Sequence, residues 1–146
     1  MAGAVAAVVV AADQATKSWA VHRLTHGPIH VVWKLSLALS YNTGSSFGLI
    51  KGWAPVLAGV AALFIVGVLG FLRHVQGMAL TVVMGLIVGG AAGNLADRIF
   101  RGHHGAVVDF VSLSFWPTFN VADSCITVGV ILAVLLTVWR APADER

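Results

Sequence analysis

The sequence predicts an all-α integral membrane protein with four transmembrane helices and a small sheet at one membrane face. Of its 146 residues, 58% are hydrophobic and only 10% are charged. The mean hydropathy is +0.89. A typical globular domain carries about 25% charged residues, so this chain has too few to cover a water-exposed surface. Together with a single cysteine, this composition excludes an ordinary soluble enzyme, a disordered chain and a disulfide scaffold.

Four segments are long and apolar enough to cross a bilayer, because a helix needs about 20 apolar residues to span roughly 30 Å of hydrocarbon. These segments are residues 1–21, 53–72, 78–96 and 121–139. The first is the least apolar, since it contains Asp13 and Lys17. It could be a cleaved signal peptide, but no basic residue precedes its apolar run. For the same reason, the native start of the protein could lie upstream of Met1.

Four spans place both long connections, residues 22–52 and 97–120, on one side of the membrane. The basic residues are scattered singly on both sides, so the positive-inside rule does not orient the chain. The sequence pI is 9.6, yet no basic cluster could follow a phosphate backbone. We therefore expect no nucleic-acid partner.

The two long connections contain segments in which apolar and polar residues partly alternate. Residues 30–41 and 107–115 show this pattern, which is typical of half-buried strands. We predict that each forms a strand and that the two make a small sheet resting on the bilayer surface. The aromatic side chains predicted to form an interfacial belt are Trp33, Tyr41, Trp53 and Trp116.

Polar residues gather at the span ends that face the long connections. Three groups at helical spacing are Asp13, Thr16 and Lys17; Asn94, Asp97 and Arg98; and Asn120 and Asp123. A further carboxylate, Asp109, precedes Asn120 by eleven residues. An ionisable side chain is costly inside a membrane and is by default a functional-site hypothesis. The chain therefore brings carboxylates from several segments to one depth.

Some of these residues have a structural interpretation. The acid-before-base order of Asp13 and Lys17 at i,i+4 predicts an ion pair. Asp97 and Arg98 could mark the end of a span where it meets water. The four-residue spacing of three glycines on the third span predicts close helix packing. These glycines are Gly85, Gly89 and Gly93.

Asp109 and Asp123 favour chemistry, because neither has a basic residue within four positions and both flank apolar sequence. Two carboxyl groups held together at a dry boundary share one proton. The ionised member can take a proton from water, and the protonated member can polarise a carbonyl group and later protonate the leaving amine. This is the chemistry of an aspartic protease, and it needs neither a metal nor another cofactor.

Other kinds of site and function are less well supported. His103 and His104 could ligate a metal with Asp97 or Asp109, but adjacent histidines point apart and no H-E-x-x-H motif is present. A small non-enzymatic conduit could use the same carboxylates, although charges do not continue through the spans. A purely structural membrane subunit would leave Asp109 and Asp123 unexplained.

Five short blocks occur in order over residues 13–124, which is most of the chain. They are Asp13-Gln-Ala-Thr-Lys17, Tyr41-Asn-Thr-Gly-Ser-Ser-Phe47, Gly89-Gly-Ala-Ala-Gly-Asn-Leu-Ala-Asp-Arg98, Val107-Val-Asp-Phe110 and Phe119-Asn-Val-Ala-Asp-Ser124. Together they closely resemble the blocks of the bacterial lipoprotein signal peptidases, the type II signal peptidases.

The resemblance implies an aspartic endopeptidase of the bacterial inner membrane with four transmembrane helices and both termini in the cytoplasm. A small β-cradle, a lid-like loop or helix and the active site would lie at the extracytoplasmic face. The substrate would be a prolipoprotein whose cysteine after the cleavage site carries diacylglyceryl. We expect a single membrane-embedded domain, surrounded by lipid, that acts as a monomer without a cofactor or metal.

The resemblance also assigns roles at matching positions. The catalytic pair would be Asp109 and Asp123, without a decision on which is the base. Residues that would position the substrate or the pair are Asn42, Asn94, Arg98 and Asn120. Residues that would support the site are Asp13, Lys17, Gly93 and Asp97. The loop containing Asn42, Gly44 and Gly48 is predicted to be a mobile cover, and the His103-His104 pair has no assigned role.

Overall fold

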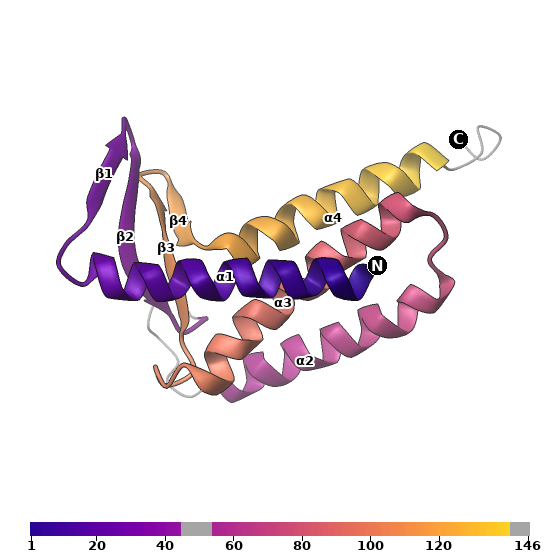
Figure 1. Cartoon of the computed structure of the whole chain (residues 1–146), viewed down its shortest axis with the longest axis horizontal. Coiled ribbons are helices and arrows are strands. Elements are labelled where there is room, and N and C mark those ends of the chain that lie inside the picture. The colour runs from indigo at the N-terminus through magenta and orange to yellow at the C-terminus, as the bar shows by residue number, and fades with distance from the viewer. Residues whose placement is uncertain (45–53, 141–146) are drawn as a thin grey trace.

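The structure, a computed structural model, describes residues 1–44 and 54–140. Four long helices extend from a four-stranded sheet that lies across one end of them (Figure 1). The helices are α1 (Ala2–Leu24), α2 (Ala54–Phe71), α3 (Met78–Phe100) and α4 (Val121–Arg140), with a 3-10 turn η1 (Leu72–His74) after α2. The strands are β1 (Ile29–Val32), β2 (Leu35–Asn42), β3 (Val107–Leu113) and β4 (Trp116–Phe119).

Three helical segments in the described part of the chain are long and apolar enough to cross a membrane. They are Ala54–His74, Met78–Phe100 and Val121–Val138. The first predicted span does form a helix, α1, but polar residues in its second half, among them Asp13 and Lys17, make it less apolar than the other three. The beginning of α1 and the end of α4 both lie away from the sheet (Figure 1).

The third helix continues four residues beyond its predicted end at residue 96. Asp97 therefore lies inside α3, and its side chain is 0% exposed. The interpretation of Asp97 as a span end that meets water is wrong. The physical reason is an ion pair of 2.9 Å from Arg101, one turn later, which together with other donors compensates the buried charge.

The predicted small sheet is present, with antiparallel strands in the order β1-β2-β3-β4. The prediction of a single strand over residues 30–41 is wrong, because the chain reverses at Trp33 and Lys34 to form a hairpin of two strands. Trp33 has a φ of 49°, as tight hairpin turns require. The second predicted strand, residues 107–115, ends at Leu113, and β4 follows it.

Glycine contacts bring the backbones of α1 and α4 against α3. A Cβ atom on Gly89 would lie 2.9 Å from the carbonyl oxygen of Ala6 in α1. A Cβ atom on Gly90 would lie 2.5 Å from the carbonyl oxygen of Ala122 in α4. The predicted close packing of the face with Gly85, Gly89 and Gly93 is therefore confirmed against α1, while Gly90 packs on α4 from another face. As a result, α3 is the central helix against which the polar residues of α1 and α4 meet.

Residues 45–53 lie outside the described residues. They include Gly48 of the predicted cover loop and Trp53 of the predicted aromatic belt. Trp33 and Trp116 lie in the sheet region with 79% and 62% of their surfaces exposed. The interfacial belt stays a prediction.

Candidate active site

A cluster of polar side chains lies where the sheet meets α1, α3 and α4. Five of its members are 0–1% exposed. These are Asp13, Lys17, Asp97, Asp109 and Asn120. Burial of so many polar groups is tolerated only when they pair with one another. The cluster therefore has to be understood as one network rather than as separate residues.

Asn120 connects the two carboxylates that the sequence singled out. Its amide nitrogen Nδ2 donates to Oδ1 of Asp109 at 2.7 Å, and its backbone N–H donates to Oδ2 of Asp123 at 3.2 Å. In return, the backbone N–H of Asp123 donates to Oδ1 of Asn120 at 2.9 Å. This reciprocal pattern is a capping box at the start of α4. It places Asp123 at the positive end of a helix dipole, which favours a negative charge.

Asn94 of α3 contacts Asp123 from the other side. Its Nδ2 donates to Oδ1 of Asp123 at 2.7 Å. Its own oxygen accepts from Nζ of Lys17 at 2.9 Å and from Nδ2 of Asn120 at 3.1 Å. Four helix and strand segments thus meet through two asparagine amides.

Asp109 lies in β3 and is almost completely buried. Burial raises the pKa of its carboxyl group to about 6, and the negative charge of Asp123 adds to that rise. Hydrogen bonding from the amides of Asn42 and Asn120 acts in the opposite direction. No group in residues 1–44 or 54–140 makes a hydrogen bond of ordinary geometry to Oδ2 of Asp109. Asn120 therefore holds Oδ1 in place, whereas Oδ2 has no such hydrogen bond within the described part of the chain.

Asn42 and Arg98 lie at the edge of this cluster. The oxygen of Asn42 accepts from the backbone N–H of Gly44 at 2.8 Å, which leaves its amide nitrogen as the group that can donate to Asp109. Arg98 interacts electrostatically with Asp123 most strongly, then with Asp109. Its Nε is buried without a hydrogen-bond partner in the described ranges. Arg98 thus has donor capacity to spare.

The residues predicted to support the site form a second layer. Nζ of Lys17 lies 2.8 Å from Oδ2 of Asp13 and 3.0 Å from Oδ2 of Asp97, and the predicted Asp13–Lys17 pair is confirmed. The other oxygen of Asp13 accepts from the backbone N–H of Ala122 at 3.0 Å. Oδ2 of Asp97 accepts from the backbone N–H of Val108, also at 3.0 Å. Asp13 thus holds the start of α4, and Asp97 holds β3.

Two members of this layer were not singled out in the sequence. Nε2 of Gln14 donates to Oδ1 of Asp97 at 2.9 Å, and Nη2 of Arg101 donates to Oε1 of Gln14 at 2.7 Å. The signal for Arg101 was its position four residues after Asp97. Gln14 could have been suspected only because it follows Asp13 directly.

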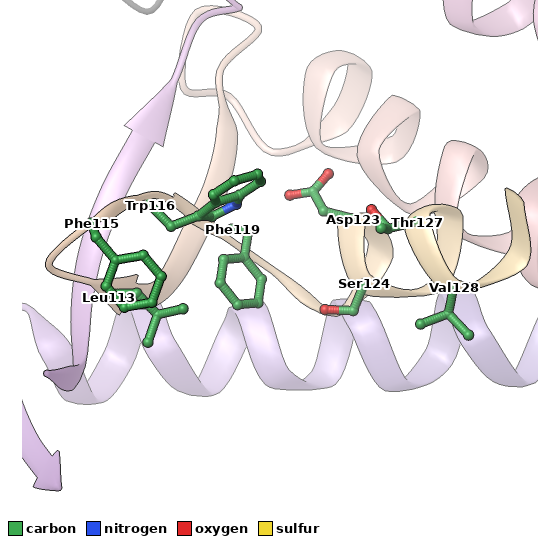
Figure 2. A pocket seen from close by; sticks show the side chains of 8 residues that line it. All are labelled: Leu113, Phe115, Trp116, Phe119, Asp123, Ser124, Thr127 and Val128. Atoms are coloured by element: carbon green, nitrogen blue, oxygen red, sulfur yellow. The ribbon is translucent and has the colours of Figure 1, made fainter. Parts of the chain in front are cut away.

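An apolar groove of about 440 Å³ opens beside Asp123. Its walls come from β3, the β3–β4 turn, β4 and the first turns of α4, and the lining residues are Leu113, Phe115, Trp116, Phe119, Asp123, Ser124, Thr127 and Val128. Figure 2 shows the carboxylate of Asp123 on the side of the groove where Trp116 lies. Of the two carboxylates in the pair, Asp123 is the one that lines the groove.

The two adjacent histidines lie apart from this cluster. The ring of His103 packs against Tyr41 with 4.5 Å between ring centroids. His104 adopts a positive φ of 52° in the turn that precedes β3. Among the described residues, no group of three or more histidine, cysteine or acidic side chains could hold a metal ion.

The fold and the site together define a helical membrane protein with a buried carboxylate and amide cluster at one end of its helices. The chain belongs to the signal peptidase II family: residues 5–139 match the family described as signal peptidase (SPase) II. The resemblance found in the five sequence blocks is therefore confirmed, and the family is one of peptidases.

Curated relatives have the same family assignment. The chain is 42% identical to the lipoprotein signal peptidase of Rhodococcus jostii (strain RHA1) over 91% of its length, and it covers 70% of that protein. It is 40% identical to the enzyme of Mycolicibacterium smegmatis, over 96% of this chain and 62% of the relative. For Mycobacterium avium (strain 104) the identity is 39%, over 96% of this chain and 80% of the relative.

Solved structures have the same architecture. Two structures, described as bacterial membrane enzymes determined by the in meso method, superpose on the chain with TM-scores of 0.83 and 0.79. Both are 25% identical to it. The first match covers 96% of this chain and 94% of the other, and the second covers 99% and 91%.

Proposed function

We propose that the protein is an aspartic endopeptidase that removes the signal peptide from prolipoproteins whose cysteine after the cleavage site carries diacylglyceryl. Membership of the signal peptidase II family and the names of the curated relatives support the substrate. The observation that supports the chemistry is the Asn120 bridge, which connects Asp109 and Asp123 while one oxygen of Asp109 has no hydrogen-bond partner among the described residues.

In this proposal the carboxyl pair shares one proton in the resting state. Below about pH 6 the proton resides on Asp109, whose pKa is raised to about 6 by burial, while Asp123 accepts hydrogen bonds from Asn94 and Asn120.

Catalysis then proceeds by proton exchange with one water molecule. Asp123 takes a proton from the water as its oxygen attacks the scissile carbonyl carbon, and Asp109 gives its proton to the carbonyl oxygen. The resulting diol collapses when the C–N bond breaks. The leaving nitrogen takes the proton from Asp123, and a diol hydroxyl returns a proton to Asp109. The cycle ends with both carboxyl groups in their initial states.

The remaining site residues would position the reactants. Asn42 and Arg98 would hold the substrate backbone, because each has donor capacity directed toward the pair. The apolar groove beside Asp123 would receive an apolar part of the substrate. Asn94 and Asn120 would hold the pair, with Asp13, Lys17, Gly93 and Asp97 behind them.

We further propose that α1 is a fourth membrane span. The beginning of α1 and the end of α4 would then face the cytoplasm, and the sheet and the carboxylate pair would lie at the extracytoplasmic face. A monomer within the lipid bilayer contains every residue that this site requires. This arrangement would bring the carboxylates to the depth at which a lipid-anchored precursor is held.

Purified protein in detergent, incubated with a diacylglyceryl-modified precursor, tests the proposal. The Asp109→Asn and Asp123→Asn variants should fold but lose at least about 10³-fold in cleavage rate, the upper range for general acid–base catalysis. Cys125→Ser is the matched control, because it changes a nucleophilic residue two positions after Asp123, and it should cleave normally. Cleavage by either aspartate variant at near the wild-type rate would rule out the pair.

A further inference from the structure

Lys17 is a fully buried cation with three partners. Its Nζ contacts Oδ2 of Asp13 at 2.8 Å, Oδ2 of Asp97 at 3.0 Å and Oδ1 of Asn94 at 2.9 Å. An ammonium group has three hydrogens to donate, so its donor capacity is used completely. Two of these contacts neutralise charge, as a structural ion pair would. The third, to a neutral amide, has no role in neutralising charge.

The contact with Lys17 selects one orientation of the Asn94 amide. Lysine can only donate, so the atom of Asn94 that faces it must be the oxygen, and Nδ2 of Asn120 donates to the same oxygen. The amide nitrogen of Asn94 then has to face Asp123, which accepts from it at 2.7 Å. A rotated amide would place an oxygen against the carboxylate and an NH₂ group against the ammonium.

We propose that Lys17 is a positioning residue for the carboxylate pair: by binding the oxygen of Asn94 it keeps the nitrogen of Asn94 on Asp123. This inference rests on the proposed function, because it assigns Lys17 a part in the reaction. A purely supporting Lys17 would contribute to folding alone. As a positioning residue, it also affects the rate and the pH dependence of cleavage.

The charge of Lys17 reaches the pair as well. It lowers the pKa of Asp109, against the larger effects of burial and of the Asp123 charge, which raise it. The other charged groups around the pair are Arg98 of α3, which interacts with both carboxylates, and Asp13 and Asp97, which partly neutralise Lys17. Loss of the Lys17 charge should therefore raise the pKa of Asp109 further.

The test compares two variants. One carries both Asp13→Asn and Lys17→Met, and the reference carries Asp13→Asn alone. Lys17→Met alone would leave Asp13 as an uncompensated buried charge, whereas Asp13→Asn alone leaves Lys17 paired with Asp97. The double change removes both charges of one pair and leaves Arg101 on Asp97. We expect kcat for a lipidated precursor to fall about tenfold or more, the effect of losing one well-placed hydrogen bond, with KM unchanged. The limb of the pH–rate profile that reports Asp109 should move to higher pH, because the Lys17 charge lowers the pKa of this group.

Arg101→Gln is the matched control. Arg101 is also a cation paired with Asp97, but its side chain contacts Asp97, Gln14 and Ser18 rather than Asn94. This variant should keep the wild-type kcat and pH limbs even if its thermal stability falls. If the double variant has the same kcat and pH–rate profile as Asp13→Asn, Lys17 is a supporting residue only. The same conclusion follows if Arg101→Gln shifts the pH–rate profile as much as the double variant does.

The wild-type protein provides a second measurement if the double variant does not fold. In ¹H–¹⁵N spectra, the side-chain NH₂ signals of Asn94, identified by their loss in Asn94→Ala, should move as the carboxylate pair titrates. Signals that do not move would show that the nitrogen of Asn94 does not face Asp123, and the inference would be wrong. Failure of the proposed function appears separately, as a wild-type protein that does not cleave the precursor.

Discussion

A side-chain carbon on Gly93 would lie 2.6 Å from Oδ2 of Asp13, closer than real Cβ contacts occur. This oxygen is also the one that binds Lys17. The approach of α3 to α1 at this level therefore depends on the absence of a side chain at Gly93. A small residue on one helix thus determines where a buried cation on the other helix lies.

Gly93→Ala should destabilise the protein by about 1–3 kcal/mol, the usual cost of overpacking, and should reduce cleavage by displacing Asp13 and Lys17. Gly67→Ala is the control, because nothing lies within 4 Å of a Cβ atom there and alanine favours a helix. Thermal unfolding in detergent measures both variants. Equal stability of Gly93→Ala and wild type would show that the helices can separate without cost.

Asp109→Asn should make the protein more stable at pH 7 while it removes cleavage. The folded-state pKa of Asp109, about 6, lies above its unfolded value. Its contribution to the free energy of unfolding is therefore fully present below about pH 4 and is lost as pH rises through about 6. Asparagine removes that loss of stability, which is on the order of 3 kcal/mol for a pKa raised by about two units. Unfolding measured from pH 4 to pH 8 should show a steeper decline in wild type than in the variant, and parallel curves would contradict the prediction.

Asn120→Ser and Asn120→Ala separate the two roles of Asn120. Serine retains a good helix cap but has no amide to reach Asp109, whereas alanine loses both functions. We expect Asn120→Ala to be less stable than Asn120→Ser by about 1 kcal/mol. Cleavage should fall by a similar factor, about 10²-fold, in both. If serine retained the wild-type rate, the bridge to Asp109 would not matter for the reaction.

Trp116→Ala should weaken the binding of lipidated precursors. The indole forms part of the groove beside Asp123, and loss of its apolar contact should raise KM about tenfold with a smaller effect on kcat. Trp33→Ala is the control, because Trp33 is also an exposed tryptophan at a hairpin turn but does not line the groove. The same rise in KM for both variants would indicate a general membrane effect.

The sequence by itself determined the features that depend on neighbouring positions. Apolar runs determined where long helices form, the four-residue spacing of Asp13 and Lys17 determined their ion pair, and glycines one turn apart determined a close helix face. The two aspartates were singled out because no basic residue lies near them in the chain and both flank apolar sequence, and their catalytic role stays a prediction. The five ordered blocks then identified the family, which residues 5–139 confirm.

Only the tertiary structure decided which of these groups meet. Lys17 reaches Asn94 across 77 positions, and Asp13 reaches the backbone of Ala122 across 109. Hydrophobic periodicity gives no information on such distances, because it specifies which face of a helix is buried and not the height at which two helices touch. Glycine contacts set that height, and as a result Asp97 is buried instead of meeting water, and Lys17 has a third partner.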